Sequence, residues 1–422
     1  MARASRPSPS KSEAAAKTIL ALALGGLGGW IFYSLRLPLP WMLGALSFTM
    51  VAALLGAPLH GPAGLRNGLI AVLGIMIGSG FTVTMLGQAG QWLVSLAAIV
   101  VYIGLTGVIV FAYLRRFGGF DRVTSYFMAM PGGLNEMTAI GHAMGGDDRA
   151  IALSHAWRLI LVVFTIPLAF RFFSGYMPPP VVFTGGFAQI SALDWALLIA
   201  CGVLGTMLGR TLRLPAPFLT GSMALSAVVH IAGLTTFRVP PLLILLAQIG
   251  IGAGLGARFA GVSPRALWRV VSVGTGGALM MLVNTALCGV AVAGLTGIPV
   301  AALLLAQIGI GAGLGARFAG VRPQALARIV AVGTGGALMM LANTALCSLA
   351  VGALTGLPVA ALLLAYAPGG LAEMSIVALS LGIDAPFVST HQLSRILLVI
   401  FIAPLFFRLL PRGNLAASPA DD

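Results

Sequence analysis

Apolar segments long enough to cross a lipid bilayer recur along the whole chain, with only short loops between them. A membrane helix needs ~20 apolar residues to cross ~30 Å of hydrocarbon, and many of these segments approach that length. Charged residues make up only 8% of the sequence, whereas a soluble protein needs roughly 25% to cover its surface. The sequence therefore predicts an all-α, polytopic transmembrane helical bundle with about 12–14 membrane segments.

The first membrane segment follows a basic N-terminal stretch that contains Lys11 and Lys17. We interpret residues 1–17 as a cytoplasmic tail and residues 411–422 as a C-terminal tail. The predicted membrane segments are 18–35, 39–56, 67–86, 91–114, 124–144, 152–173, 190–209, 216–233, 240–257, 270–294, 299–316, 329–353, 358–381 and 387–410.

Two motifs occur once in each half of the chain, which indicates an internal duplication. Leu35–Trp41 resembles Leu212–Phe218, and Pro131–Met137 matches Pro368–Met374. After the second motif the halves align without gaps, so that Arg158 corresponds to Arg395. We predict two homologous membrane repeats, residues 18–175 and 190–410, a construction typical of secondary transporters.

A second, more recent repeat lies inside the second half. Residues 247–305 recur as 306–364, with 48 of 59 aligned positions identical. Each copy spans about two helices, so the sequence predicts a tandem duplicated helical hairpin. Whether the two halves run parallel or inverted stays open, because the arginines at 115–122 and those at 258–269 fall on opposite sides in our count of segments.

Glu136 and Glu373 lie near the middles of long apolar segments. A charged side chain there costs about 2.5–3.5 kcal/mol on insertion scales, so it usually faces a cavity or a partner. Each glutamate follows a Pro-Gly-Gly sequence, which predicts a break in the helix at mid-depth and free backbone groups directed at a cavity. The candidate site for a substrate or proton is Pro131, Gly132, Gly133, Asn135, Glu136, Pro368, Gly369, Gly370, Glu373, Arg158, Arg395, His155 and His391.

Arg158 and Arg395 allow two interpretations. They could pair with the glutamates as structural clamps, or they could balance charge and meet an anionic substrate in a working site. His155 and His391 come shortly before the two arginines and are either packed residues or members of a proton relay. The histidines show no metal-ligand spacing, so we expect no metal site and no cofactor.

Other sequence features point to packing. The glycine-rich runs Gly74–Gly80, Gly250–Gly256 and Gly309–Gly315 favour close helix packing, because no βαβ unit surrounds them as a nucleotide site would require. Cys201, Cys288 and Cys347 are expected to be small packing residues. The net charge of +14 comes from arginines scattered at segment ends, which suits membrane anchoring and predicts no direct nucleic-acid binding.

The duplicated halves, each with a Leu-Pro-x-Pro start and a Pro-Gly-Gly-Leu-x-Glu-Met segment, resemble the AbrB-duplication family of bacterial inner-membrane proteins. The resemblance covers roughly residues 20–410. It implies a multi-pass protein of the bacterial inner membrane. Members carry two conflicting labels, membrane regulator of gene expression and ammonia monooxygenase. The extra 59-residue copy departs from the family pattern.

Three functions follow as hypotheses. The first is a secondary transporter or permease for a small molecule, with a coupling proton or ion and without enzymatic activity. The second is a membrane-embedded regulator that acts through a soluble partner, and the third is a metalloenzyme of the ammonia monooxygenase type. The expected partners are the lipid bilayer and a small-molecule substrate, and a homo-oligomer is an open alternative.

Overall fold

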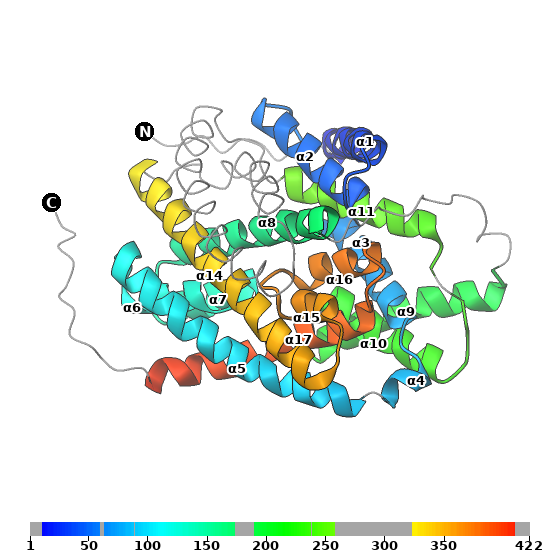
Figure 1. Ribbon diagram of the computed structural model, residues 1–422. Helices are drawn as coiled ribbons and strands as arrows, with labels where there is room; N and C mark the ends of the chain where they lie inside the picture. Colours follow the sequence, from blue (N-terminus) through cyan, green and yellow to red (C-terminus); the bar gives the residue numbers. More distant parts are fainter. Residues whose placement is uncertain are drawn as a thin grey trace.

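In a computed structural model of the 422-residue chain, the structure describes residues 11–59, 63–87, 89–173, 190–237, 239–257 and 323–409. These residues form helices and no β-strand (Figure 1). The helices are α1 (Lys11–Ser34), α2 (Pro40–Leu54), α3 (Ala63–Gly78), α4 (Val83–Leu86), α5 (Ala89–Tyr113), η1 (Leu114–Gly118), α6 (Arg122–Ala129), α7 (Leu134–Ala143), α8 (Asp148–Phe173), α9 (Ala192–Thr211), α10 (Pro217–Ile231), α11 (Pro241–Gly256), α14 (Pro323–Thr355), α15 (Val359–Tyr366), α16 (Leu371–Ser380) and α17 (Ala385–Leu409).

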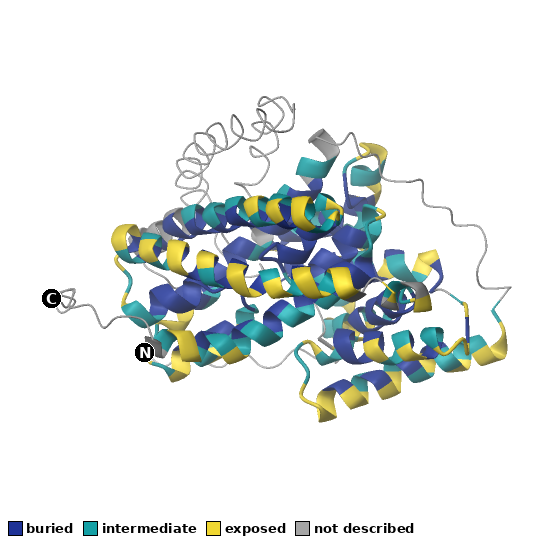
Figure 2. Cartoon of the chain, turned by 60° about the horizontal axis from the view of Figure 1, so that its bottom comes forward, coloured by how far each residue is buried: buried dark blue, intermediate teal, exposed yellow. Residues whose placement is uncertain are grey.

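Six of the described helices are long and apolar enough to cross a membrane, and five shorter ones are apolar. Their outward faces carry large exposed apolar side chains, among them Trp30, Val101 and Met207. Figure 2 shows exposed residues, in yellow, along the outer sides of the long helices. Such a surface suits lipid, so the predicted helical membrane bundle is confirmed. Helix α1 begins at Lys11, inside the predicted cytoplasmic tail.

The two halves repeat the same order of elements. Helices α1–α3 correspond to α9–α11, and α5–α8 correspond to α14–α17. Thr106 of α5 accepts a hydrogen bond from Asn343 of α14, with Nδ2–Oγ1 at 2.7 Å. These two residues occupy the same position in the two repeats, because their numbers differ by 237. A contact between equivalent residues places them next to the axis that relates the halves.

The relation between the halves is an inversion. Toward its end α5 meets the beginning of α14, since a Cβ at Gly335 would touch Tyr113 and one at Gly336 would lie 3.2 Å from Val110. Helix α14 therefore runs antiparallel to its own counterpart α5. Equivalent helices that run in opposite directions indicate inverted repeats, which answers the question that the sequence left open.

The helices form two groups. The first group, which we call the outer group, contains α1–α3 and α9–α11; the second, the hairpin group, contains α5–α8 and α14–α17. Figure 1 shows the two groups side by side. Helix α3 makes the main contacts between them, against α16 and α17, and a Cβ at Gly80 would lie 2.8 Å from Pro386.

Helices α6 and α7 form a re-entrant hairpin, not a single crossing. The backbone N–H of Asp147, just after α7, donates to Thr124 Oγ1 near the start of α6 at 2.8 Å. A straight helix of this length would place those residues ~35 Å apart. The predicted crossing at 124–144 is therefore wrong in its path, although the predicted break at Pro131 is confirmed.

The second half contains the same hairpin, formed by α15 and α16. Gln392 of α17 binds Leu364 of α15, and Arg395, further along α17, binds Gly369 at the tip. Ser389, earlier along α17, meets Ser375 of α16 at 2.7 Å. Helix α15 thus runs parallel to α17 and α16 runs back, so the predicted segment 358–381 also turns within the membrane.

This path removes one crossing from the count that made the arginine pattern conflict. With α6–α7 returning to its own side, the described helices α1–α8 make an odd number of crossings, as inverted repeats require. The end of α5 and the end of α11 then fall on one side. The arginines at 115–122 follow α5 on that side, in line with the positive-inside rule, whereas those at 258–269 lie outside the described residues.

The described bundle contains only part of each copy of the 59-residue repeat. The end of α11 belongs to the copy at 247–305, and α14 with most of α15 belongs to the copy at 306–364. Residues 258–322, which include the end of the first copy and the start of the second, lie outside the described part of the chain. The predicted C-terminal tail, residues 411–422, and residue 410 also lie outside it.

Glycines allow the outer group to pack closely. A Cβ at Gly78 of α3 would collide with the backbone of α10, and one at Gly252 of α11 would collide with the backbone of α2. The packing role predicted for these two glycine-rich runs is confirmed. The third run, Gly309–Gly315, lies outside the described residues.

Candidate functional site

The tip of the first hairpin is a short extended segment between α6 and α7. Met130 and Gly133 adopt extended backbone angles, which leaves the carbonyl groups of the tip without helical partners. Pro131 and Gly132 are buried and Gly133 is half-buried. The equivalent tip, Ala367 to Gly370, has the same conformation and is equally enclosed. In both halves the Pro-Gly-Gly sequence creates the break that the sequence predicts.

Arg158 supplies the missing hydrogen bonds at the first tip. It projects from α8 and is 5% exposed. Its Nη1 donates to the Met130 carbonyl at 2.9 Å, and its Nη2 donates to the Gly132 carbonyl at 2.8 Å. Its Nε reaches across to the other half and donates to the Pro368 carbonyl at 3.0 Å. The two tips are therefore joined through one guanidinium group.

Arg395 does the same for the second tip. It is 1% exposed, and its Nη1 and Nη2 donate to the carbonyls of Ala367 and Gly369, which are the repeat equivalents of Met130 and Gly132. By symmetry its Nε would donate to Pro131. Instead this buried Nε has no hydrogen-bond partner among the described residues.

Glu136 and Glu373 occupy the first turns of α7 and α16. A carboxylate is favourable there because the helix N-terminus carries partial positive charge. Each carboxylate lies against the glycine just before its helix, so a Cβ at Gly133 or Gly370 would collide with it. Neither glutamate forms a hydrogen bond or ion pair with another described residue. The arginines bind carbonyl oxygens in this structure, and their predicted roles toward the glutamates or a substrate stay predictions.

The two glutamates differ in exposure. Glu373 is 6% exposed, whereas Glu136 is only half-buried and its neighbour Asn135 is exposed. Helix α3 of the outer group packs on α16 and α17, which accounts for the covering of the second tip. Glu136 is therefore the more exposed of the two site glutamates.

His155 and His391 hold backbone groups. His155 Nε2 donates to the Phe127 carbonyl at 2.8 Å. His391 Nδ1 donates to the Phe387 carbonyl at 2.8 Å, which leaves Nε2 to accept from the Ser95 hydroxyl at 2.7 Å. The described residues contain no group of three or more histidine, cysteine or acidic side chains placed to hold a metal ion.

Sequence reasoning missed Gln392, which is the true equivalent of His155. Its Nε2 donates to Leu364, the repeat counterpart of Phe127, at 2.7 Å. His391 lies one residue before the position equivalent to His155, so the two histidines are not counterparts in the repeat. The alignment offset of 237 between the halves contains the signal that would have found it.

A set of uncharged polar side chains beside the tips was also missed. The Thr344 hydroxyl donates to the Tyr102 hydroxyl at 3.1 Å, close to the bond between Asn343 and Thr106. The Tyr102 ring stacks on Tyr366 with ring centres 5.7 Å apart. Uncharged polar residues inside apolar segments indicate such contacts between helices. Charge alone does not identify them.

The family model described as "Transition state regulatory protein AbrB" matches residues 41–306 and 298–411. The chain belongs to the AbrB family. A Bacillus subtilis (strain 168) relative named "Uncharacterized protein YhjN" is 25% identical over 420 residues, which is 95% of this chain and 94% of that protein. A relative from Escherichia coli (strain K12), described as a candidate regulator and named AbrB, is 27% identical over 229 residues, or 54% of this chain and 66% of that protein.

Proposed function

We propose that this AbrB-family protein is a secondary transporter of the bacterial inner membrane, with its substrate or proton site at the two hairpin tips. The observation that carries the proposal is the meeting of two re-entrant hairpins from opposite repeats, each with a glutamate beside its Pro-Gly-Gly break. Inverted repeats with broken segments that meet at the midplane are the usual construction of such transporters.

The asymmetry between the halves supports alternating access. Arg158 links its tip to Pro368, while the matching Nε of Arg395 has no partner among the described residues. Glu136 is accessible and Glu373 is covered. In the complementary state the halves exchange these roles: Arg395 Nε binds the Pro131 carbonyl, and α16 becomes the open hairpin.

Two chemical roles follow for the site. A glutamate beside the opening can take up and release a proton as the site changes sides. The arginines donate hydrogen bonds to the free carbonyl groups of the tips, so that this polar backbone is tolerated within an apolar bundle. A small polar substrate would bind between the tips, where both hairpins present backbone groups.

The test is transport by the purified protein in proteoliposomes. Counterflow with a defined mixture of isotope-labelled amino acids, organic acids and sugars, together with a trapped pH-sensitive dye, reports substrate and proton flux. We expect Glu136→Gln and Glu373→Gln to abolish or strongly reduce the flux, and the surface variant Asp148→Asn to leave it unchanged. If both glutamate variants retain every flux of the wild type, the proposal fails.

The name of the Escherichia coli relative favours a second function, a membrane-embedded regulator that acts through a soluble partner. This function predicts that a deletion strain has an altered transcriptome and that the protein captures a cytoplasmic partner. An unchanged transcriptome together with no captured partner would count against it.

A further inference from the structure

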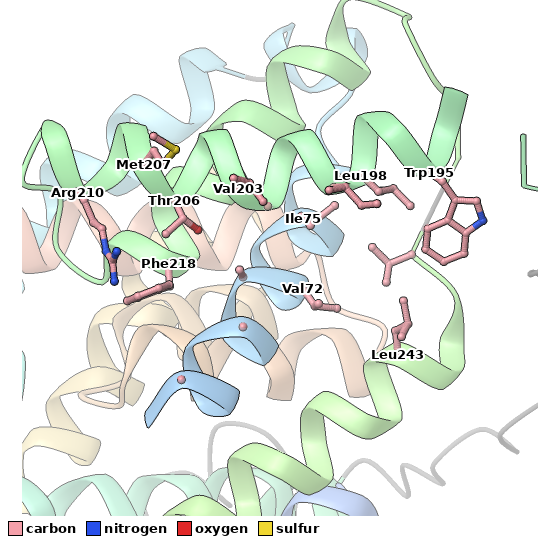
Figure 3. A pocket seen from close by; sticks show the side chains of 16 residues that line it. Val72, Ile75, Trp195, Leu198, Val203, Thr206, Met207, Arg210, Phe218 and Leu243 are labelled. Atoms are coloured by element: carbon pink, nitrogen blue, oxygen red, sulfur yellow. The ribbon is translucent and has the colours of Figure 1, made fainter. Parts of the chain in front are cut away.

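The outer group contains an apolar groove that the transport site does not use. It lies between α3, α9, α10 and α11 and has a volume of about 540 Å³. Val72, Ile75, Leu198 and Leu243 line its walls (Figure 3). This volume falls within the ~300–1,000 Å³ of typical ligand sites.

Three glycines make room for the groove. A Cβ at Gly64 or Gly68 would meet nothing within 4 Å, and one at Gly202 would only touch Ile75 at 3.4 Å. By contrast, a Cβ at Gly205, one turn further along α9, would lie 2.7 Å from the backbone of α10. The glycines of the groove are therefore not required for helix contact, and they leave space that another molecule can fill.

The other half has no such space at the equivalent position. Gly25 of α1 is the repeat counterpart of Gly202, and a Cβ there would lie 3.1 Å from Ala253 and 3.3 Å from Ile249 of α11. Helix α1 thus packs more tightly on α11 at this position than α9 packs on α3. The groove is a departure from the symmetry of the fold.

The groove has one charged end. Trp195 lies at one end and Arg210 at the other (Figure 3), and 15 residues of helix between them span ~22 Å. The Arg210 guanidinium lies 4.5 Å from the centre of the Phe218 ring, and its side chain is exposed together with that of Arg213. Hydrocarbon walls with a cationic end complement a molecule that carries an acyl chain and an anionic headgroup.

We propose that this groove binds an anionic membrane phospholipid, with one acyl chain along α9 and α3 and the phosphate at Arg210. The groove is longer than the ~15 Å half-thickness of a bilayer core, so a chain from the leaflet at Arg210 fits within it. The positive-inside pattern assigns that end to the cytoplasmic leaflet. This inference does not depend on transport activity.

The test is native mass spectrometry of the full-length protein in detergent, titrated with phosphatidylglycerol or with phosphatidylethanolamine of the same acyl chains. We expect one tightly bound lipid and a preference of about fivefold for phosphatidylglycerol, as one surface arginine supplies. Arg210→Gln should remove the preference, and Arg149→Gln, an exposed arginine elsewhere, should keep it.

Groove-filling variants complete the test. Gly68→Leu and, independently, Gly64→Leu should lose the bound lipid, while Gly104→Leu should retain it because Gly104 faces equally open space on α5. Equal binding of both lipids by the wild type, or retention of the lipid in both filled variants, overturns the proposal. A change of oligomeric mass on filling, with no lipid bound to the wild type, would instead assign the groove to a second copy of the chain.

Discussion

Replacement of Arg158 by methionine tests whether the guanidinium group holds the hairpin tips together. Arg158→Met removes three hydrogen bonds from a buried cation to the carbonyls of Met130, Gly132 and Pro368. Each bond to a charged group contributes about 1.5–3 kcal/mol. Part of that gain is offset, because removing a charge from the interior relieves its desolvation penalty of several kcal/mol.

The three buried carbonyls left without a donor cost about 1–3 kcal/mol each, so after the offset from the removed charge we expect a net loss of about 3–5 kcal/mol. An unfolding entropy of about 2.1 cal/mol/K per residue gives about 0.9 kcal/mol/K for a chain of 422 residues. The midpoint of thermal unfolding in detergent should therefore fall by about 3–6 °C. Arg395→Met should behave similarly, because it also binds three carbonyls.

The control is Arg149→Met, the same substitution at an exposed position at the start of α8. A surface change of this kind alters stability by less than about 0.5 kcal/mol, so its midpoint should stay within about 1 °C. The reasoning is refuted if Arg158→Met unfolds at the wild-type temperature, or if Arg149→Met is equally destabilising.

Three further predictions concern the repeat, the topology and pH. Deletion of residues 258–316 removes one repeat length of 59 residues, which reduces the offset of 237 between the later parts of the halves to 178, within one residue of the offset of 177 at their starts. The variant should therefore fold and keep its stability, and aggregation of a well-expressed deletion would argue otherwise. Phe117 and Leu354 are exposed equivalents in the two halves, so in a variant without native cysteines Leu354→Cys should react with an impermeant maleimide in intact cells, and Phe117→Cys only in inverted vesicles. Reaction of both from one side would contradict inverted repeats. Burial raises the pKa of Asp384, partly offset by the hydrogen bond from the Phe387 N–H. Because the pKa is raised in the folded state, the ionised carboxylate destabilises the folded protein at neutral pH. This destabilisation disappears as the pH falls below the pKa of the unfolded chain, ~3.9. Asp384→Asn should therefore be more stable than wild type at pH 7 and lose that advantage near pH 4, and an advantage independent of pH would count against this assignment.

The sequence predicts most of the fold because hydrophobic length and repetition are local properties. The apolar segments, the two halves and the breaks at Pro131 and Pro368 can all be read without coordinates. The reversal of direction at each break cannot, since a segment of this length suits either one crossing or two short helices. Tertiary contacts decide between them, such as the bond from the Asp147 backbone to Thr124 in the first half and the contact of Ser389 with Ser375 in the second.

The candidate site is predictable in part for the same reason. Glu136 and Arg158 stand out because a charge in hydrocarbon is costly. That Arg158 binds carbonyl oxygens depends on how the hairpin turns back, which no local pattern encodes. Tyr102 and Gln392 carry no charge, so they are recognised only once the hairpin places them beside the tips.

The most direct test of the central claim, that two oppositely inserted hairpins meet at a water-accessible site, is thiol labelling of their tips from each side of the membrane. Asn135 and Ala372 are equivalent residues beside the two glutamates. We predict that Asn135→Cys reacts with an impermeant reagent faster from the cytoplasmic side than from the outside, and that Ala372→Cys reacts more slowly than Asn135→Cys and faster from the outside. The reverse preference at both tips, or no reaction at either tip until the protein is unfolded, would contradict the account.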